Sequence, residues 1–204
     1  YHNIMFALVE DGSITKYFNG KRGFTLNGNQ YPKQVFTIWT KSEREAIGIY
    51  EVVWDNTNKK DEQWYINTNP SYSFGSGKVT ASYGSATAKP HADVLFTAQD
   101  EEDGLGTEGE VSARGLKYKK IQEIKTQAAA ILAETDWYII RKADANTAIP
   151  SSITNHRAAV RTKCAQMETA ITNAANTAAI EALYTFNNDD PPTRPLGQLP
   201  RLET

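Results

Sequence analysis

The spacing of hydrophobic residues changes about halfway along the chain. Before residue 100, short apolar runs alternate with polar turns, a pattern typical of β-strands. After it, apolar residues recur every third or fourth position and alanine becomes frequent, as in amphipathic helices. The sequence therefore predicts an α+β protein with a small antiparallel β region, followed by a helical hairpin and an extended C-terminal tail.

Two hairpins are expected in the β region. Residues 6–18 place apolar runs on both sides of Asp11-Gly12, a pair that suits a tight turn with positive φ. Residues 49–54 and 62–67 are expected to form the second hairpin around a polar turn. Further short strands are expected at 34–40, 78–84 and 93–98, and loops at 20–32 and 67–77.

One short helix interrupts the expected strands. Thr40 lies three residues before Glu43, the spacing of a capping box, and Gly48 lies where a helix would stop. We therefore expect a helix over residues 41–47 that connects two strands.

The alanine-rich half has the pattern of two long helices. The apolar face of the first is formed by Ile121, Ile124, Ala128 and Ile131, and that of the second by Ile153, Val160, Cys164, Met167 and Ile171. The first helix should end near Glu134, with Thr135 capping a short turn, and Pro150 should start the second. A break at residues 173–177 precedes a last short helix. Two helices joined by a compact corner should pair antiparallel.

Polar segments separate these regions. The acidic, glycine-containing stretch at residues 99–114 is too polar to pack and is expected to be a linker. The predicted organisation is a β-rich N-terminal domain at residues 1–98, the acidic linker at 99–114, a helical hairpin module at 115–186 and a proline-rich extended tail at 187–204.

The tail contains four prolines, which exclude a helix or an internal strand. Leu196, Leu199 and Leu202 recur every three residues, close to the polyproline period. Three interpretations remain open: the leucines dock on a partner, they pack on their own chain, or the tail is disordered.

Composition and charge exclude some classes of function. A net charge of −2 and a pI near 6.0 give no electrostatic reason to expect nucleic-acid binding. No stretch has the roughly 20 apolar residues of a membrane span, and residues 1–12 lack the pattern of a signal peptide. The single cysteine, Cys164, forms no internal disulfide, which suits synthesis in a reducing cytosol.

No catalytic or cofactor site is predicted. The three histidines, His2, His91 and His156, lack further ligands at metal-binding spacing. The acids at residues 100–103 lack the alternation of a calcium loop, and the glycines at 75–77 lack the spacing of a phosphate loop. Cys164 is expected to be a small core residue, because no base lies nearby. We therefore expect no metal, no cofactor and no enzymatic activity.

Aromatic residues of the β region allow a second interpretation. Trp39, Trp54, Trp64 and Tyr65 could present a face on which sugars stack, although strand aromatics more often form core.

An acid, a tryptophan and two arginines stand out around the helical corner. Asp136 precedes Trp137, and Arg157 and Arg161 lie one turn apart on the second helix. An arginine can pair with a carboxylate and stack on an indole. We expect a structural clasp in which Trp137 fills the corner and Asp136 pairs with an arginine. The alternative is that the arginines face an acidic partner.

The segment "LAETDWYIIRKADANTAIP…HRAAVR" resembles a small C-terminal module of tailed-bacteriophage proteins. In that module a leucine-alanine run and Thr-Asp-Trp precede a Tyr-Arg-x-x-Leu/Val-Arg helix; the match covers residues 132–137 and 157–161, and His156 stands where the family usually has tyrosine. Some members are tail assembly chaperones, and others lie at the ends of tail-fibre and baseplate proteins. The stretches "MFALVEDGSITKYFNG", "VFTIWTKSEREAIGIYEV" and "TRPLGQLPRLE" are similar to virion structural proteins of marine tailed phages, particularly cyanophages.

The resemblance implies a structural role in a virion. The expected function is a connector in the tail, fibre or baseplate region, made in the host cytoplasm and present in several copies, because tail platforms are symmetric. Its expected partners are other virion tail proteins. The alternatives are a tail assembly chaperone absent from the mature particle and a module that binds a host-surface glycan.

Overall fold

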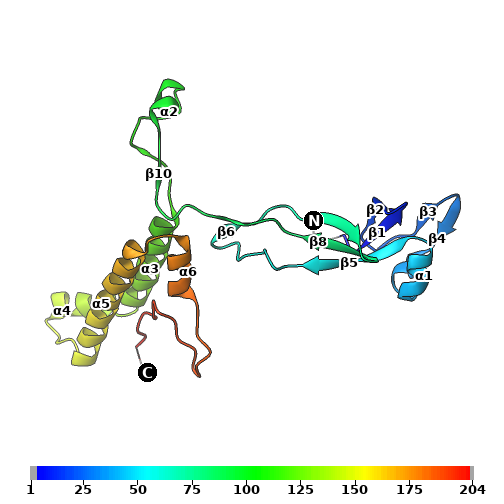
Figure 1. Ribbon diagram of the computed structural model, residues 1–204. Helices are drawn as coiled ribbons and strands as arrows, with labels where there is room; N and C mark the ends of the chain where they lie inside the picture. The colour runs from blue at the N-terminus through cyan, green and yellow to red at the C-terminus, as the bar shows by residue number, and fades with distance from the viewer. Residues whose placement is uncertain (1–3, 203–204) are drawn as a thin grey trace. The chain divides into compact units, whose positions relative to one another are not determined.

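The chain folds as a mixed α+β protein of small sheets and several helices, which confirms the predicted fold class (Figure 1). The computed structural model describes residues 4–202. It divides into two compact units, Tyr1–Thr87 and Ala88–Thr204. The division therefore precedes the boundary expected near residue 98. Residues 90 and 91 belong with the helices, because their carbonyls accept hydrogen bonds from the amides of Leu116 and Lys117.

The first unit is built on a five-stranded sheet with the order β2-β1-β5-β8-β7. Its strands are β1 (Phe6–Glu10), β2 (Ser13–Phe18), β5 (Ile49–Asp55), β7 (Ser71–Gly75) and β8 (Lys78–Ser82). Three pairings are antiparallel, but β5 and β8 run parallel, with Val52 opposite Val79. The sheet is therefore mixed, in contrast to the antiparallel region expected. The reason is that β7 takes the edge and its hairpin partner β8 lies beside β5.

Tight turns with two residues at positive φ close three hairpins. Asp11-Gly12 joins β1 to β2 as predicted, with φ of 50° and 75°. Asn27-Gly28 and Ser76-Gly77 make the same kind of turn. The segments 20–32 and 67–77, expected to be loops, therefore contain strands: β3 (Phe24–Leu26), β4 (Asn29–Tyr31) and β7.

Two further expectations for this unit are wrong. Residues 34–40 form no strand; Lys33–Phe36 is a turn of 3-10 helix that buries Val35 and Phe36. The second expected hairpin does not form either, because β5 pairs with β1 and β8. Residues 62–67 contribute only the short strand β6 (Tyr65–Ile66), and the other short strand before the helices is β9 (Thr87–Ala88).

Strand β1 is buried on both faces of the sheet. Phe6 and Leu8 pack on one side with Phe36 and Ile49, while Ala7 packs on the other. The second cluster consists of Ala7, Val52, Val79 and Ala81. This continuous burial explains why β1 is a run of apolar residues instead of an alternating pattern.

Helix α1 (Lys41–Ala46) confirms the predicted capping box. The Thr40 hydroxyl accepts a hydrogen bond from the Glu43 amide, and the Glu43 carboxylate accepts one from the Thr40 amide. The Thr40 amide and hydroxyl both donate to the Glu43 carboxylate and so lower its pKa. Gly48 follows the helix with φ +83°, as the predicted stop requires.

The second unit begins with a projecting ribbon, residues 93–114, called the arm here. Strands β10 (Val94–Leu95) and β11 (Val111–Ala113) pair antiparallel, and α2 (Ala98–Glu102) lies at the tip. The expected linker at 99–114 is thus folded. The sequence signal that was missed is a second capping box, between Thr97 and Asp100. The expected strand at 93–98 shrinks to two residues.

The helices of the second unit follow the sequence pattern closely. They are α3 (Leu116–Ala133), α4 (Asp136–Ala145), α5 (Ser151–Asn173) and α6 (Thr177–Tyr184). Lys117 at the start of α3 donates to the carbonyl of Thr172 at the end of α5, so the two helices are antiparallel, as predicted. The corner contains a ten-residue helix, α4, in place of the short turn expected.

The core of the second unit is the seam between α3 and α5. It contains Ile124, Ala128, Val160, Cys164, Met167, Ile171 and, from the tail, Leu196. Every residue expected on the second helix's apolar face is buried, which confirms that prediction.

The conformation of Gly48 provides a test of the first unit. A Cβ at this position would lie 2.7 Å from the carbonyl oxygen of Val9, and its φ is unfavourable for other residues. Gly48→Ala should destabilise the unit by about 2–4 kcal/mol, because strain and a backbone clash combine. Gly12→Ala is the matched control, since its φ is also positive but its Cβ would meet nothing within 4 Å. Urea unfolding followed by tryptophan fluorescence measures both; equal losses would contradict the clash.

Candidate functional site

Arg157 forms the centre of the helical corner. One nitrogen of its guanidinium, Nη1, donates to the Leu132 carbonyl at 2.7 Å and to the Thr135 hydroxyl at 2.8 Å. The same nitrogen lies 2.9 Å from a carboxylate oxygen of Asp136. The Arg157 side chain is only 12% exposed. The structure thus brings together Asp136 and Arg157, two of the four residues of the expected clasp.

The position of Arg157 has a simple electrostatic reason. The last carbonyls of a helix have no partner within it, and the helix dipole places partial negative charge there. Leu132 is in the last turn of α3, so a cation satisfies its carbonyl and the dipole together. Thr135 is 3% exposed, and its hydroxyl also donates to the carbonyl of Leu132. The buried hydroxyl of Thr135 therefore has hydrogen-bond partners in the turn between α3 and α4.

Trp137 and Arg161 do not take part in the clasp. Trp137 is 49% exposed, and its ring packs on Tyr138 and under the Arg141 guanidinium. Arg161 is exposed, and its side chain makes no hydrogen bond or ion pair with any residue between 4 and 202. The expectation that Trp137 fills the corner is wrong, because α4 turns this side chain outward and Thr135 occupies the interior.

The tail packs on its own chain. Leu196 is 2% exposed in the α3–α5 core, its amide donates to the carbonyl of Leu183, and Leu199 packs against the same cluster. Only Leu202, at 37% exposure, remains open to solvent. Of the three open interpretations, packing on the chain itself describes Leu196 and Leu199. The tail is therefore not a free docking peptide.

A short hydrogen-bonded loop directs the tail back to the helices. The Asn187 side chain donates to the Thr193 hydroxyl and accepts from the Thr193 amide. After this loop, Arg194 donates to the carbonyl of Gly197 and stacks over Tyr184. Burial, and to a lesser extent the charge of Glu123, raises the pKa of Tyr184 to about 12.

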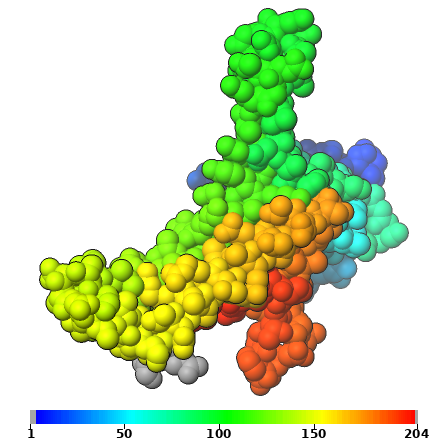
Figure 2. Space-filling view, turned by 90° about the vertical axis from the view of Figure 1, so that its left-hand side faces the viewer, coloured from blue at the N-terminus to red at the C-terminus, as the bar shows by residue number. Residues whose placement is uncertain are grey.

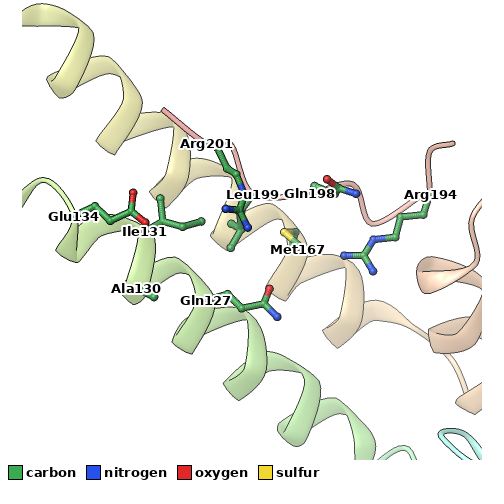
Figure 3. Close-up of a pocket in the computed structure, with 9 residues that line it drawn as sticks. All are labelled: Gln127, Ala130, Ile131, Glu134, Met167, Arg194, Gln198, Leu199 and Arg201. Atoms are coloured by element: carbon green, nitrogen blue, oxygen red, sulfur yellow. The ribbon is translucent and has the colours of Figure 1, made fainter. Parts of the chain in front are cut away.

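Because the tail lies across α3 and α5, it creates a groove, called the tail groove here (Figure 3). Its volume is about 460 Å³. Its apolar residues are Ala130, Ile131, Met167 and Leu199, and its polar residues are Gln127, Glu134, Arg194, Gln198 and Arg201. Figure 3 shows Arg194 at one end and Glu134 at the other, with Arg201 close to Leu199 between them. Such a groove can hold an apolar side chain flanked by acids.

The arm stands clear of the helices of its unit (Figure 2), where it is drawn in green. Its large exposed side chains are Val94, Leu95, Leu105 and Val111, with Leu105 the most open at 64%. Helix α4 has a similar outward apolar surface in Trp137, Ile139 and Ile140. Apolar side chains grouped on projecting elements are typical of protein–protein contact surfaces.

The histidines and Cys164 were the other residues considered for chemistry. His156 is buried in the core-facing side of α5, His91 is half-buried and its carbonyl caps α3, and His2 lies outside the described residues. Cys164 is buried, and burial together with Glu168 raises the pKa of its thiol, which opposes nucleophilic reactivity. No group of three metal-ligating side chains occurs within residues 4–202.

The aromatic residues of the β region do not form one exposed face. Trp64 and Tyr65 are buried, at 3% and 7% exposure, and Trp39 and Trp54 are half-buried. Trp54 contacts Tyr72 and Tyr83, and Trp39 contacts Tyr31. The core interpretation therefore describes these four residues better than a sugar-stacking face.

Comparisons with known proteins add no assignment. No family model matches the chain, and no match was found among curated proteins or solved structures. In the part of the chain from residue 4 to 202, no helix is long and apolar enough to cross a membrane.

Neither the tail groove nor the arm is among the features predicted from the sequence. One signal was present for the groove: Arg194 and Arg201 flank Leu196 and Leu199, a pattern that suggests charged edges around an apolar strip. For the arm, Leu105 between two glycines and several acids was an exposed apolar residue in a polar turn.

Replacing Arg157 tests the corner. Arg157→Met keeps much of the side-chain volume but removes the donors to Leu132, Thr135 and Asp136. We expect the free energy of unfolding of the helical unit to fall by about 2–3 kcal/mol, since a charged hydrogen-bonding group is lost from a mostly buried position. Arg161→Met is the control and should change it by less than about 0.5 kcal/mol. Denaturation followed by far-UV circular dichroism measures both; equal effects would rule out the corner as the cause.

Shortening Leu196 tests the tail. Leu196→Ala should cost about 2–4 kcal/mol, because it opens a cavity in the α3–α5 core. Leu202→Ala, at a more exposed position six residues on, should cost well under about 1 kcal/mol. Thermal unfolding of the full chain compares them. An unchanged midpoint for Leu196→Ala would mean that the tail does not contribute to the fold.

Proposed function

We propose that this protein is a structural component of a tailed-bacteriophage virion, in the tail, fibre or baseplate region, where it connects larger virion proteins. The observation that carries the proposal is the set of exposed apolar side chains on the arm and α4. Burying such surfaces requires protein partners. The resemblance of residues 132–137 and 157–161 to a module of tailed-phage proteins supplies the biological setting.

A connector needs at least two contact surfaces on a stable body. The chain has two separately packed units, so each can bind a different neighbour. In the second unit, the arm and α4 lie at opposite ends of α3, with the base of the arm at Gly115 and the start of α4 at Asp136. This separation supports simultaneous contacts with two partners.

The composition of purified particles tests the proposal. Phage particles purified by density-gradient centrifugation should contain the protein in a fixed ratio to the major tail protein, measured by quantitative mass spectrometry. Infected-cell lysate, analysed in parallel, shows whether the protein is made. Presence in the lysate and absence from particles would contradict the connector and favour a tail assembly chaperone.

A second measurement addresses the surfaces. Phage carrying Leu95→Asp on the arm should incorporate less of the protein, because a charge replaces an exposed apolar side chain at the proposed contact. The matched control is Ile66→Asp, an exposed aliphatic residue of the first unit. Equal incorporation of the Leu95→Asp and wild-type proteins would exclude this part of the arm as a contact.

A further inference from the structure

Leu105 is the most exposed large apolar side chain of the second unit after Ile140, and it follows α2, the helix at the tip of the arm. Its amide donates to the carbonyl of Asp100, and Gly104, which donates to Glu101, turns the chain at φ +73°. The side chain is therefore held outward by the turn that follows α2. Because this turn is held by hydrogen bonds, the exposed leucine can insert into a groove on another surface.

The tip is already ordered before any contact. The Glu108 amide donates to the Glu101 carboxylate, and the Phe96 carbonyl accepts from the Gly109 amide. The Phe96 ring lies so close to Gly106 that a Cβ there would clash with it. A preorganised tip loses little conformational entropy on binding, which favours association.

Acidic residues surround Leu105 on both sides in the sequence. Glu101, Glu102 and Asp103 precede it, and Glu108 and Glu110 follow it. Over residues 93–114 there are seven acids and one base, Arg114, a net charge of −6. The whole chain has a net charge of −2, so the remaining residues have a net charge of +4. The arm is therefore the acidic element of an otherwise basic chain.

The tail groove has the complementary arrangement. Its apolar residues include Ile131, Met167 and Leu199; Arg194 lies at one end, and Arg201 lies beside Leu199 (Figure 3). The amides of Gln127 and Gln198 offer donors and acceptors along its edges. One acid, Glu134, also lines it. The groove thus offers an apolar strip beside two guanidinium groups, which suits an apolar side chain that has acids close to it.

We propose that the arm tip of one copy of this chain binds the tail groove of a second copy. Leu105 inserts between Ile131, Met167 and Leu199, and the acids on either side of it pair with Arg194 and Arg201. The inference concerns the association of the chain with itself, so it stands or falls independently of the virion assignment.

The geometry of the arm favours a second copy over the same molecule. The base of the arm is fixed to the start of α3, because the Asp93 carboxylate accepts from the Gly115 amide and pairs with Arg114. From there the ribbon extends away from the helices, and the groove lies along the far half of α3. The tip therefore points away from its own groove.

The contact joins two different surfaces, so it is heterologous. Each copy offers one tip and one groove, and repeated contacts generate a closed ring or an open filament. When the groove of one copy is occupied, the arm tip of that copy is still free to bind the groove of a further copy.

Sedimentation velocity of the full chain over a range of concentrations tests the association. The wild-type protein should form dimers and larger species as the concentration rises. Leu105→Asp and Arg201→Glu should each raise the dissociation constant about 10- to 100-fold, as expected for losing a buried leucine or reversing a paired charge. Ile38→Asp, at an even more exposed position in the first unit, is the control and should associate like wild type. Raising the ionic strength from about 0.1 M to about 1 M should weaken association.

Cysteine cross-linking identifies the contact. Native Cys164 is buried, so Leu105→Cys and Gln198→Cys chains each carry one accessible thiol. Mixed and oxidised, they should form a disulfide-linked heterodimer, whereas Ile38→Cys mixed with Gln198→Cys should not. A monomer at all concentrations overturns the proposal, as does a heterodimer yield no higher than that of the control. A chain carrying both cysteines that cross-links only within itself also overturns it, because the tip would then occupy its own groove.

Discussion

The packing of α3 against α5 is the contact on which the second unit depends. Val160 and Ile171 are fully buried in this seam, and Met167 is 2% exposed. Most of the stability of helices in proteins comes from packing of an apolar face, so burial of one apolar stripe against the other stabilises both helices. The arm ends directly before the first turn of α3, and the tail lies across both helices, so the positions of the arm and the tail depend on this seam.

The corner between α3 and α4 shows how one side chain completes the seam. The guanidinium of Arg157 contacts the carbonyl of Leu132, the hydroxyl of Thr135 and the carboxylate of Asp136. With these groups paired, α4 needs no buried apolar residue of its own and has none. Its large side chains, Trp137 among them, are therefore available to solvent or to a partner.

The proposed connector function and the proposed self-association use different surfaces of the second unit. The outward residues of α4, such as Ile140, and the flanks of the arm, such as Leu95, remain free when Leu105 occupies a neighbouring groove. Copies linked through tip and groove would thus present a repeated set of apolar surfaces to larger proteins. Weak contacts repeated many times produce stable attachment through their effective concentration.

The sequence by itself determined the elements whose signals are local. The Asp11-Gly12 turn, the capping box of α1 and the apolar faces of α3 and α5 each depend on residues within a turn or two of one another. Asn27-Gly28 carried the same kind of signal, and the hairpin there was predictable. Local backbone preference and side-chain period act before any long-range contact forms.

The tertiary structure decided which distant segments meet. β5 pairs in parallel with β8 instead of forming a hairpin with residues 62–67, because the neighbour of a strand depends on the whole sheet. Likewise, the burial of Leu196 and the exposure of Trp137 depend on where the tail and α4 pack. The tail groove is lined by residues of α3, α5 and the tail segment 194–201, which are far apart in the sequence. No local sequence pattern indicates that these segments come together. Burial is a property of the assembled core, so only the folded chain fixes it.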